Sequence, residues 1–405
     1  MAVLGTKSES IFMEQIFTAT RTWSPPFSCR AHVTVIGPGG SGASGRSTSD
    51  NYACAASGGG AGGCAKSLIV LSSSVTYTIT IGAGGASVSG AAGNNGGASS
   101  EFTGSDITDM AGAVGSGGVQ SVAAATVSIQ AGGAGGAATG GSIWNVTGGV
   151  GGSATCSQYE AGNGTYFCSG GGGAPGILGE AFRGGNALSS TDAYDHNAMA
   201  GGAGVGGRGG DATITGGAQS YADGQGGCAD GPGADATATS NDDDYGPYRQ
   251  YHTGENILNN QCNNYTTRLG LNAQAMVADV YYQPPDSQGA SSGQAASIFQ
   301  GLTGQGGSYA QGNTSRFSGP GAGGSGYWTT VDATRGEHCP GLFGGGGGGV
   351  VNYDGSAGNT NTGYGAAGSF GGGGGAIVGY CSSSNAANSG AGGAGLVVVT
   401  ILEVL

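Results

Sequence analysis

The chain has 405 residues, of which 95 are glycine. Charged residues make up 9% and hydrophobic residues 37%, and there are ten prolines. The chain therefore fits neither the highly charged disordered class nor collagen, which needs a strict Gly-X-Y period and abundant proline. A formal net charge of −13 disfavours binding to nucleic acid, because only a basic surface displaces the counterions of the phosphate backbone.

Three segments near the N-terminus have the pattern of β-strands. Residues 15–23 are the first candidate, and residues 31–36 are the second, which Gly37 and Pro38 end. Residues 75–81 are the third, because four apolar residues alternate there with threonines: Val75, Tyr77, Ile79 and Ile81. This alternation predicts a strand that is buried on one face.

Glycine is concentrated in blocks rather than spread evenly. The clearest blocks are Ser57-GGGAGG-Cys64, Ala200-GGAGVGGRGG-Asp211, Phe343-GGGGGG-Val350 and Phe370-GGGGG-Ala376. Ordering one residue costs roughly 1–2 kcal/mol, and glycine loses the most freedom, so such blocks fold only if their bare backbones pack together or a partner holds them. The conformation that suits them is the extended left-handed helix of the polyproline II type, which leaves every N–H and C=O free for neighbouring segments.

The last ten residues form the strongest β segment of the chain. Residues 396–405 read LVVVTILEVL, and a segment of this kind invites aggregation if its edge is exposed. We therefore expect it to return and pair beside the N-terminal strands, in particular with residues 31–36. The two ends of the chain would then close one domain, and the glycine-rich middle would be one long excursion from it.

Nine cysteines form no C-x-x-C pair. Two short loops could be closed by disulfides, Cys54 with Cys64 and Cys156 with Cys168; alternatively, the cysteines are reduced and act as small hydrophobic side chains. No run of about 18 apolar residues occurs, and the N-terminus lacks the order of a signal peptide. We expect no membrane insertion and no export by an obvious route.

Motifs for chemistry are weak. Matches to G-x-G-x-x-G recur, but none has a strand-to-helix setting with a downstream acid. The cluster Glu337-His338-Cys339 is short of the four ligands of a zinc site, and Asn241–Asp244 lacks the acid spacing of a calcium loop, so both favour ordinary loops. No pair of carboxylates has a catalytic spacing. We expect no enzyme activity, no cofactor and no metal.

The stretch 240–300 is the best candidate for recognition, because it breaks the glycine pattern and mixes tyrosine with Asn, Gln, Ser and Thr. Binding loops use this mixture, in which tyrosine gives rigid contact area and amides give adaptable hydrogen bonds. The contact candidates are Tyr245, Tyr248, Tyr251, His252, Tyr265, Tyr281 and Tyr282. The alternative is that these side chains fill gaps between glycine segments or join subunits. A short helix over residues 272–282 is also expected, which Pro284 and Pro285 would end.

Several ordered elements carry a resemblance to a known family. They are Phe17, Trp23 and Pro25 in that order, VTVIGPGGSG over 33–42, GGGAGGCAKSLIVL over 58–71, VTYTITIGAGGA over 75–86 and GAGGAGLVVVTI over 390–401. Together they resemble the glycine-rich domain of bacteriophage tail proteins. Residues 13–110 and 390–405 carry the likeness, and residues 111–390 share only the composition.

The resemblance implies a mostly β fold with little helix: a small β-sandwich base closed by N- and C-terminal strands, with a polyglycine II-like extension. The expected organisation is an N-terminal arm over 1–12, a base over 13–110 and 390–405, and a glycine-rich extension over 111–389 with the insertion 240–300.

The implied function is that of a phage virion protein at the tail tip or tail fibre that recognises the host surface. The alternative is a structural head decoration or head fibre without a receptor role. The expected partners are other virion proteins, through the N-terminal region, and a host surface glycan or outer-membrane protein, with assembly as a homo-oligomer and no nucleic acid. The expected location is the virion surface, after assembly in the host cytoplasm, on an extracellular particle.

Overall fold

The computed structural model describes residues 13–47, 53–124, 130–155, 165–175, 179–189, 197–204, 207–215, 221–224, 226, 235–238, 316–317, 327–329, 338–339, 344–351, 362–365, 367–380 and 386–405. Within these ranges there are strands in several sheets and no helix, so the protein is mostly β, as the sequence predicts. The expected helix over 272–282 lies outside the described residues.

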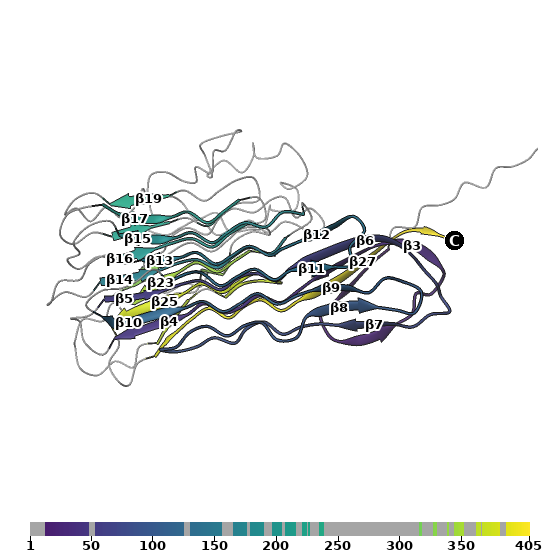
Figure 1. Ribbon diagram of the computed structural model, residues 1–405, viewed down its shortest axis with the longest axis horizontal. Coiled ribbons are helices and arrows are strands. Elements are labelled where there is room, and N and C mark those ends of the chain that lie inside the picture. The colour runs from purple at the N-terminus through teal and green to yellow at the C-terminus, as the bar shows by residue number, and fades with distance from the viewer. Residues whose placement is uncertain are drawn as a thin grey trace, which may run out of the picture.

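Two five-stranded antiparallel sheets form one end of the molecule, which we call the base (Figure 1). The first sheet has the order β1 (Met13–Phe17), β27 (Leu396–Val404), β3 (Cys29–Ile36), β6 (Cys64–Leu71) and β12 (Trp144–Val146). The second has the order β11 (Ala138–Thr139), β9 (Met110–Gly112), β8 (Ser100–Thr103), β7 (Tyr77–Thr80) and β2 (Arg21–Trp23).

The two sheets of the base share one apolar core. Alternate residues of β3 are buried, from Cys29 to Val35, and they pack with Tyr77, Ile79 and Phe102 of the second sheet. The rings of Tyr77 and Phe102 stack with centroids 5.3 Å apart. Period-two burial of this kind is what the sequence alternation in 75–81 predicts. The sandwich remains an interpretation, which the shared core supports.

The C-terminal strand lies where the sequence analysis expects it. Strand β27 pairs antiparallel with β3 on one side and with β1 on the other, with Val397 opposite Val35 and Val399 opposite Val33. Val397, Val399 and Ile401 are fully buried. The predicted pairing of the two ends of the chain is therefore confirmed.

Residues 15–23 do not form one strand, so that prediction is wrong. Strand β1 ends at Phe17 in the first sheet, and β2 starts at Arg21 in the second. The chain crosses between the sheets here because both aromatic residues reach the core, with Phe17 buried and Trp23 packed against it. Their rings meet edge to face with centroids 5.7 Å apart.

Mainly parallel strands lie at the opposite end of the molecule, and we call them the distal strands (Figure 1). One sheet has the order β10 (Gln120–Ala124), β5 (Ala53–Ala56), β14 (Thr165–Cys168), β16 (Asn197–Met199) and β18 (Tyr221–Asp223). A second has the order β13 (Ala154–Thr155), β15 (Ala187–Ser189), β17 (Ala212–Ile214) and β19 (Ala236–Ala238). A third has the order β21 (Tyr327–Thr329), β23 (Gly349–Val351), β25 (Ile377–Tyr380) and β4 (Ser44–Ser47).

Two further pairs of short parallel strands complete the described elements. They are β20 (Arg316–Phe317) with β22 (His338–Cys339), and β24 (Thr362–Tyr364) with β26 (Ala386–Asn388). The segments that run between the base and the distal strands are rich in glycine, and we call them the glycine body. They include residues 37–43 and 57–63 as well as later segments of the chain.

Glycine segments in the body hydrogen-bond to one another through their backbones. In the segment 57–63, every third N–H donates to the same neighbour: Ser57, Gly60 and Gly63 donate to Val119, Ser116 and Ala113, at 2.9, 2.9 and 3.0 Å. Gly59 and Gly62 donate to a second neighbour, at Gly374 and Gly371, and Ala61 donates to a third, at Gly149. The donor direction thus repeats every three residues.

The carbonyl groups of the same segment follow the same period. Ser57, Gly60 and Gly63 accept from Ala43, Gly40 and Gly37, while Gly58 and Ala61 accept from Gly133 and Gly136, and Gly59 accepts from Gly172. Six neighbouring segments therefore surround residues 57–63. A side chain has no room at Gly60, since a Cβ added there would lie closer than 3.0 Å to the Ala134 carbonyl.

Candidate functional site

The chain leaves one set of parallel distal strands and enters another at one end of the molecule. Strands β13, β15, β17 and β19 are parallel to one another, and so are β14, β16 and β18; the first set ends, and the second begins, at this end (Figure 1). Figure 1 places these strand ends on the side remote from the base. Binding residues are often found on such connections, held by a rigid scaffold.

The recognition candidates of the sequence analysis belong to the connection that follows β19. This strand ends at Ala238 at the distal end, and all seven candidates lie outside the described residues: Tyr245, Tyr248, Tyr251, His252, Tyr265, Tyr281 and Tyr282. The structure therefore describes the strand that leads into the stretch 240–300 and does not test the candidates themselves.

A polar ladder runs across the residues that precede four parallel strands. Its members are Ser153, Asn186, Asp211 and Asp235, which stand directly before β13, β15, β17 and β19. Each backbone N–H donates to a side-chain oxygen of the next segment: Ser153 to Asn186 Oδ1 at 2.8 Å, Asn186 to Asp211 Oδ1 at 2.7 Å and Asp211 to Asp235 Oδ1 at 2.8 Å. Side-chain oxygens thus extend the hydrogen bonding between the strands of this sheet by one residue.

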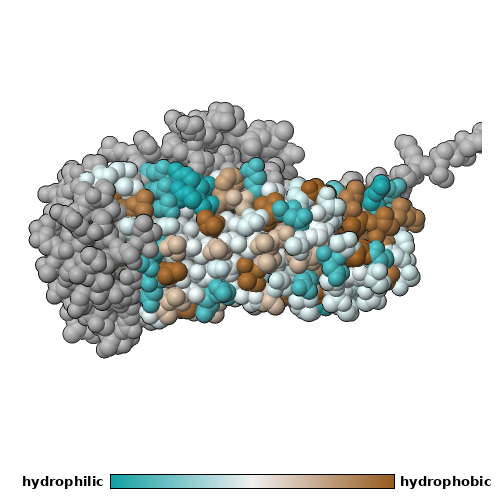
Figure 2. All heavy atoms as spheres, in the orientation of Figure 1, coloured by the Kyte–Doolittle hydropathy of each residue, from teal (hydrophilic) through white to brown (hydrophobic). Residues whose placement is uncertain are grey.

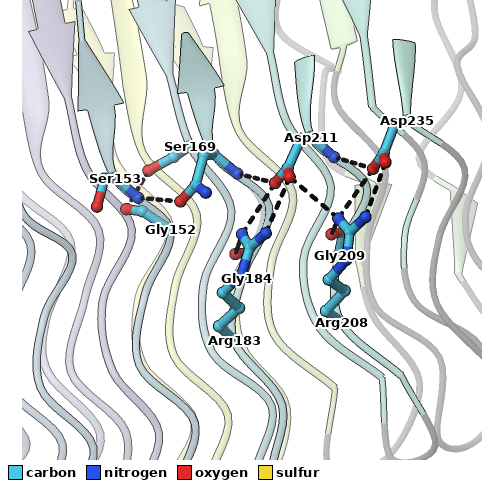
Figure 3. Close-up of polar contacts among 10 residues, drawn as sticks. Gly152, Ser153, Ser169, Arg183, Gly184, Arg208, Gly209, Asp211 and Asp235 are labelled. Carbon is cyan, nitrogen blue, oxygen red and sulfur yellow. Dashed lines mark hydrogen bonds and ion pairs between the residues drawn. The ribbon is translucent and has the colours of Figure 1, made fainter. Parts of the chain in front are cut away.

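Two arginines complete this polar ladder (Figure 3). Arg183 donates to both carboxylate oxygens of Asp211, at 2.8 and 2.9 Å, and Arg208 donates to both of Asp235, at 2.8 and 2.7 Å. Arg208 also lies 3.2 Å from Asp211. Paired, parallel hydrogen bonds of this kind are among the strong ones, and they fix the geometry of both partners.

The charges of the ladder compensate one another. The hydrogen bond to Asp235 raises the pKa of Arg208 above its usual value. Burial alone would raise the pKa of Asp235, but the Arg208 guanidinium and the Asp211 N–H outweigh it and lower that pKa. Asp235 is therefore a carboxylate at neutral pH, and the side-chain oxygens of both aspartates accept from guanidinium and amide donors.

Metal ligands do not gather in the part of the chain that the structure describes. No group of three or more His, Cys, Asp or Glu side chains comes together there. His338 and Cys339 lie in the short strand β22, while Glu337 and Asn241–Asp244 are outside the described ranges.

Two cysteines of the base are buried thiols. Cys29 and Cys64 are fully buried and free, so the alternative of a Cys54–Cys64 disulfide is wrong. Burial raises the pKa of Cys64 to about 12, which keeps it protonated and unreactive at neutral pH. Cys156 lies outside the described residues, and its pairing stays untested.

Sequence reasoning missed the polar ladder, although a signal for it exists. The segments before β13, β15 and β17 read VGGSA over 150–154, RGGNA over 183–187 and RGGDA over 208–212, and the segment before β19 reads PGADA over 232–236. An alignment of these four segments would have placed the two arginines at one position and the ladder residues at another, and so indicated a repeated pairing.

Comparison with known proteins gives no assignment. No family model matches the chain, and no curated protein matches it. Among the described residues, none belongs to a helix long and apolar enough to cross a membrane.

Proposed function

We propose that this chain is a bacteriophage virion protein, a component of the tail tip or tail fibre that recognises the host cell surface. The observation that carries the proposal is the common location of the distal strand ends, opposite a base that both ends of the chain close. A rigid body with connections collected at one tip suits a protein that presents binding segments away from a particle.

The glycine body supports this proposal as a stiff spacer. A hydrogen-bond direction that repeats every three residues, toward six neighbours, is what packed polyglycine II helices would produce, because that helix has three residues per turn. We assign the glycine blocks to this conformation. Such a spacer is held by backbone hydrogen bonds and needs few charged or large side chains.

The base is the end that we assign to the particle. Large apolar side chains are exposed there, namely Ile16, Leu68, Val70, Val404 and Leu405, and Figure 2 shows apolar residues gathered over this end. Exposed apolar groups of this kind are typical of protein contacts. Other virion proteins would bind here, beside the N-terminal region, and copies of the chain would assemble as a homo-oligomer on the virion surface.

The stretch 240–300 is the proposed contact with the host, a surface glycan or an outer-membrane protein. Its chain leaves β19 at the distal end, so it starts at the tip and away from the base. The structural alternative, a head decoration or head fibre, would use the same stiff body without a receptor.

The proposal predicts a specific loss of attachment. The double change Tyr248→Ala with Tyr251→Ala should reduce adsorption of particles to cells at least tenfold, because truncating one anchor of a contact typically costs about 2 kcal/mol or more. Adsorption counts, with immunoblots for incorporation, measure this effect. The control is Val119→Ala, which shortens an exposed side chain of the body.

Two outcomes contradict the receptor role. Unchanged adsorption of the double variant removes the stretch from the contact. Loss of the protein from particles makes the tyrosines subunit contacts and favours the structural alternative. Electron microscopy of particles labelled on this chain separates tail from head directly.

A further inference from the structure

The polar ladder pairs residues of successive repeats by charge. In two rungs, the residue three positions before a ladder residue binds the ladder residue of the following segment: Arg183 binds Asp211, and Arg208 binds Asp235. The first segment has the uncharged Val150 at this position, and the ladder residue that follows is the uncharged Asn186. Each arginine is thus followed, in the next segment, by an aspartate at the ladder position, and the uncharged valine is followed by an asparagine.

Glycine segments need such a device because their backbones are alike. A segment that slips along its neighbour by one three-residue period can make the same backbone hydrogen bonds, so those bonds do not select one register. Side chains select it when a slip removes their partners. In the ladder, a slip would separate Arg183 from Asp211 and Arg208 from Asp235, and so break two bidentate pairs.

We infer that Arg183, Arg208, Asp211 and Asp235 form a register code that fixes which segment stacks on which, and that its last rung positions the root of the stretch 240–300. These are positioning residues. The last rung holds Asp235, and β19 follows it directly and leads into that stretch. In the sequence, Pro232 stands where a further arginine would continue the code, so the code ends at this rung. The consequence for attachment rests on the proposed function; the register does not.

The chain itself supplies the variants for a test. Asp235→Asn keeps the acceptor for the Asp211 N–H, as Asn186 does for Ser153, and removes only the ion pair. Arg208→Val leaves Asp211 its bidentate partner Arg183. The double variant places Val and Asn on one rung, which is the neutral combination that Val150 and Asn186 already form.

The rate of amide hydrogen exchange in β19, measured on the full-length protein, tests the register independently of the proposed function. Each single variant should raise exchange at residues 236–238 by about two- to fivefold, the range for one partly exposed ion pair. The double variant should exchange no faster than either single one, because no charge is left without a partner. Equal exchange in all four proteins, or effects of the two changes that simply multiply, would overturn the register code.

Adsorption of particles that carry Asp235→Asn separates this inference from the proposed function. Faster exchange in β19 with reduced adsorption supports both. Faster exchange with unchanged adsorption keeps the register code and overturns the positioning of the stretch 240–300 by its last rung, while the double variant Tyr248→Ala with Tyr251→Ala tests the host contact separately. Unchanged exchange overturns the register code whatever the adsorption shows.

Discussion

At the scale of single residues, glycine acts here by the absence of a side chain. The N–H of Gly60 donates to Ser116, its C=O accepts from Gly40, and the Ala134 carbonyl occupies the space that a Cβ would need. At Ser57, a serine in a glycine segment completes the network with its hydroxyl. Ser57 Oγ accepts from the Val119 N–H at 2.7 Å and donates to the Ala131 carbonyl at 2.7 Å.

The change Gly60→Ala should therefore destabilise the protein by about 1–3 kcal/mol or more, because the added methyl group forces the packed backbones apart. Thermal or denaturant unfolding of the purified chain measures this. Gly97→Ala is the matched control, since Gly97 is exposed and the nearest atom to its added Cβ is 3.2 Å away. Similar stability of the two variants would contradict close packing around residues 57–63.

At the scale of elements, the apolar pattern of a segment determined how well it could be predicted. Residues 75–81 alternate apolar residues with threonines, and residues 396–405 are a nearly continuous apolar run; strands β7 and β27 lie in these segments, and each has a buried face. Residues 15–23 also look like one strand, but Phe17 and Trp23 serve a core that lies between two sheets, and local pattern does not reveal the crossing.

Strand β27 is central to the predicted closure of the base by the last residues of the chain. The change Ile401→Ala removes a fully buried side chain from the core of the base and should lower the free energy of unfolding by about 2–5 kcal/mol. Val404→Ala, near the end of the same strand, shortens an exposed side chain and should change it by less than about 0.5 kcal/mol. Equal melting temperatures of the two variants would show that β27 does not close the core.

The neighbours of each glycine segment could not be predicted from the sequence. Segments such as 57–63, 113–119 and 371–374 differ by few side chains, so no local pattern states which one lies beside which. The polar ladder is the exception, because its arginines and acids mark successive segments. The recognition candidates were predicted from composition alone, and they stay a prediction because they lie outside the described residues.

At the scale of the whole molecule, a core held by backbone hydrogen bonds differs from an apolar one in how it protects its amides. The base depends on buried Val, Ile and aromatic side chains, whereas in the glycine body each N–H of residues 59–63 has a backbone acceptor within 3.0 Å.

Slow amide exchange is therefore expected in the body as well as in the base, despite its glycine content. Peptides that cover 59–63 and 371–374 should exchange as slowly as peptides of β3, because an N–H opens only when its neighbouring segments separate. Exchange mass spectrometry of the intact chain measures both regions in one experiment, and an unstructured glycine peptide provides the fast reference. Exchange of residues 59–63 at the rate of an unstructured glycine peptide would mean that the body is a flexible linker, and a stiff spacer between particle and host would then be excluded.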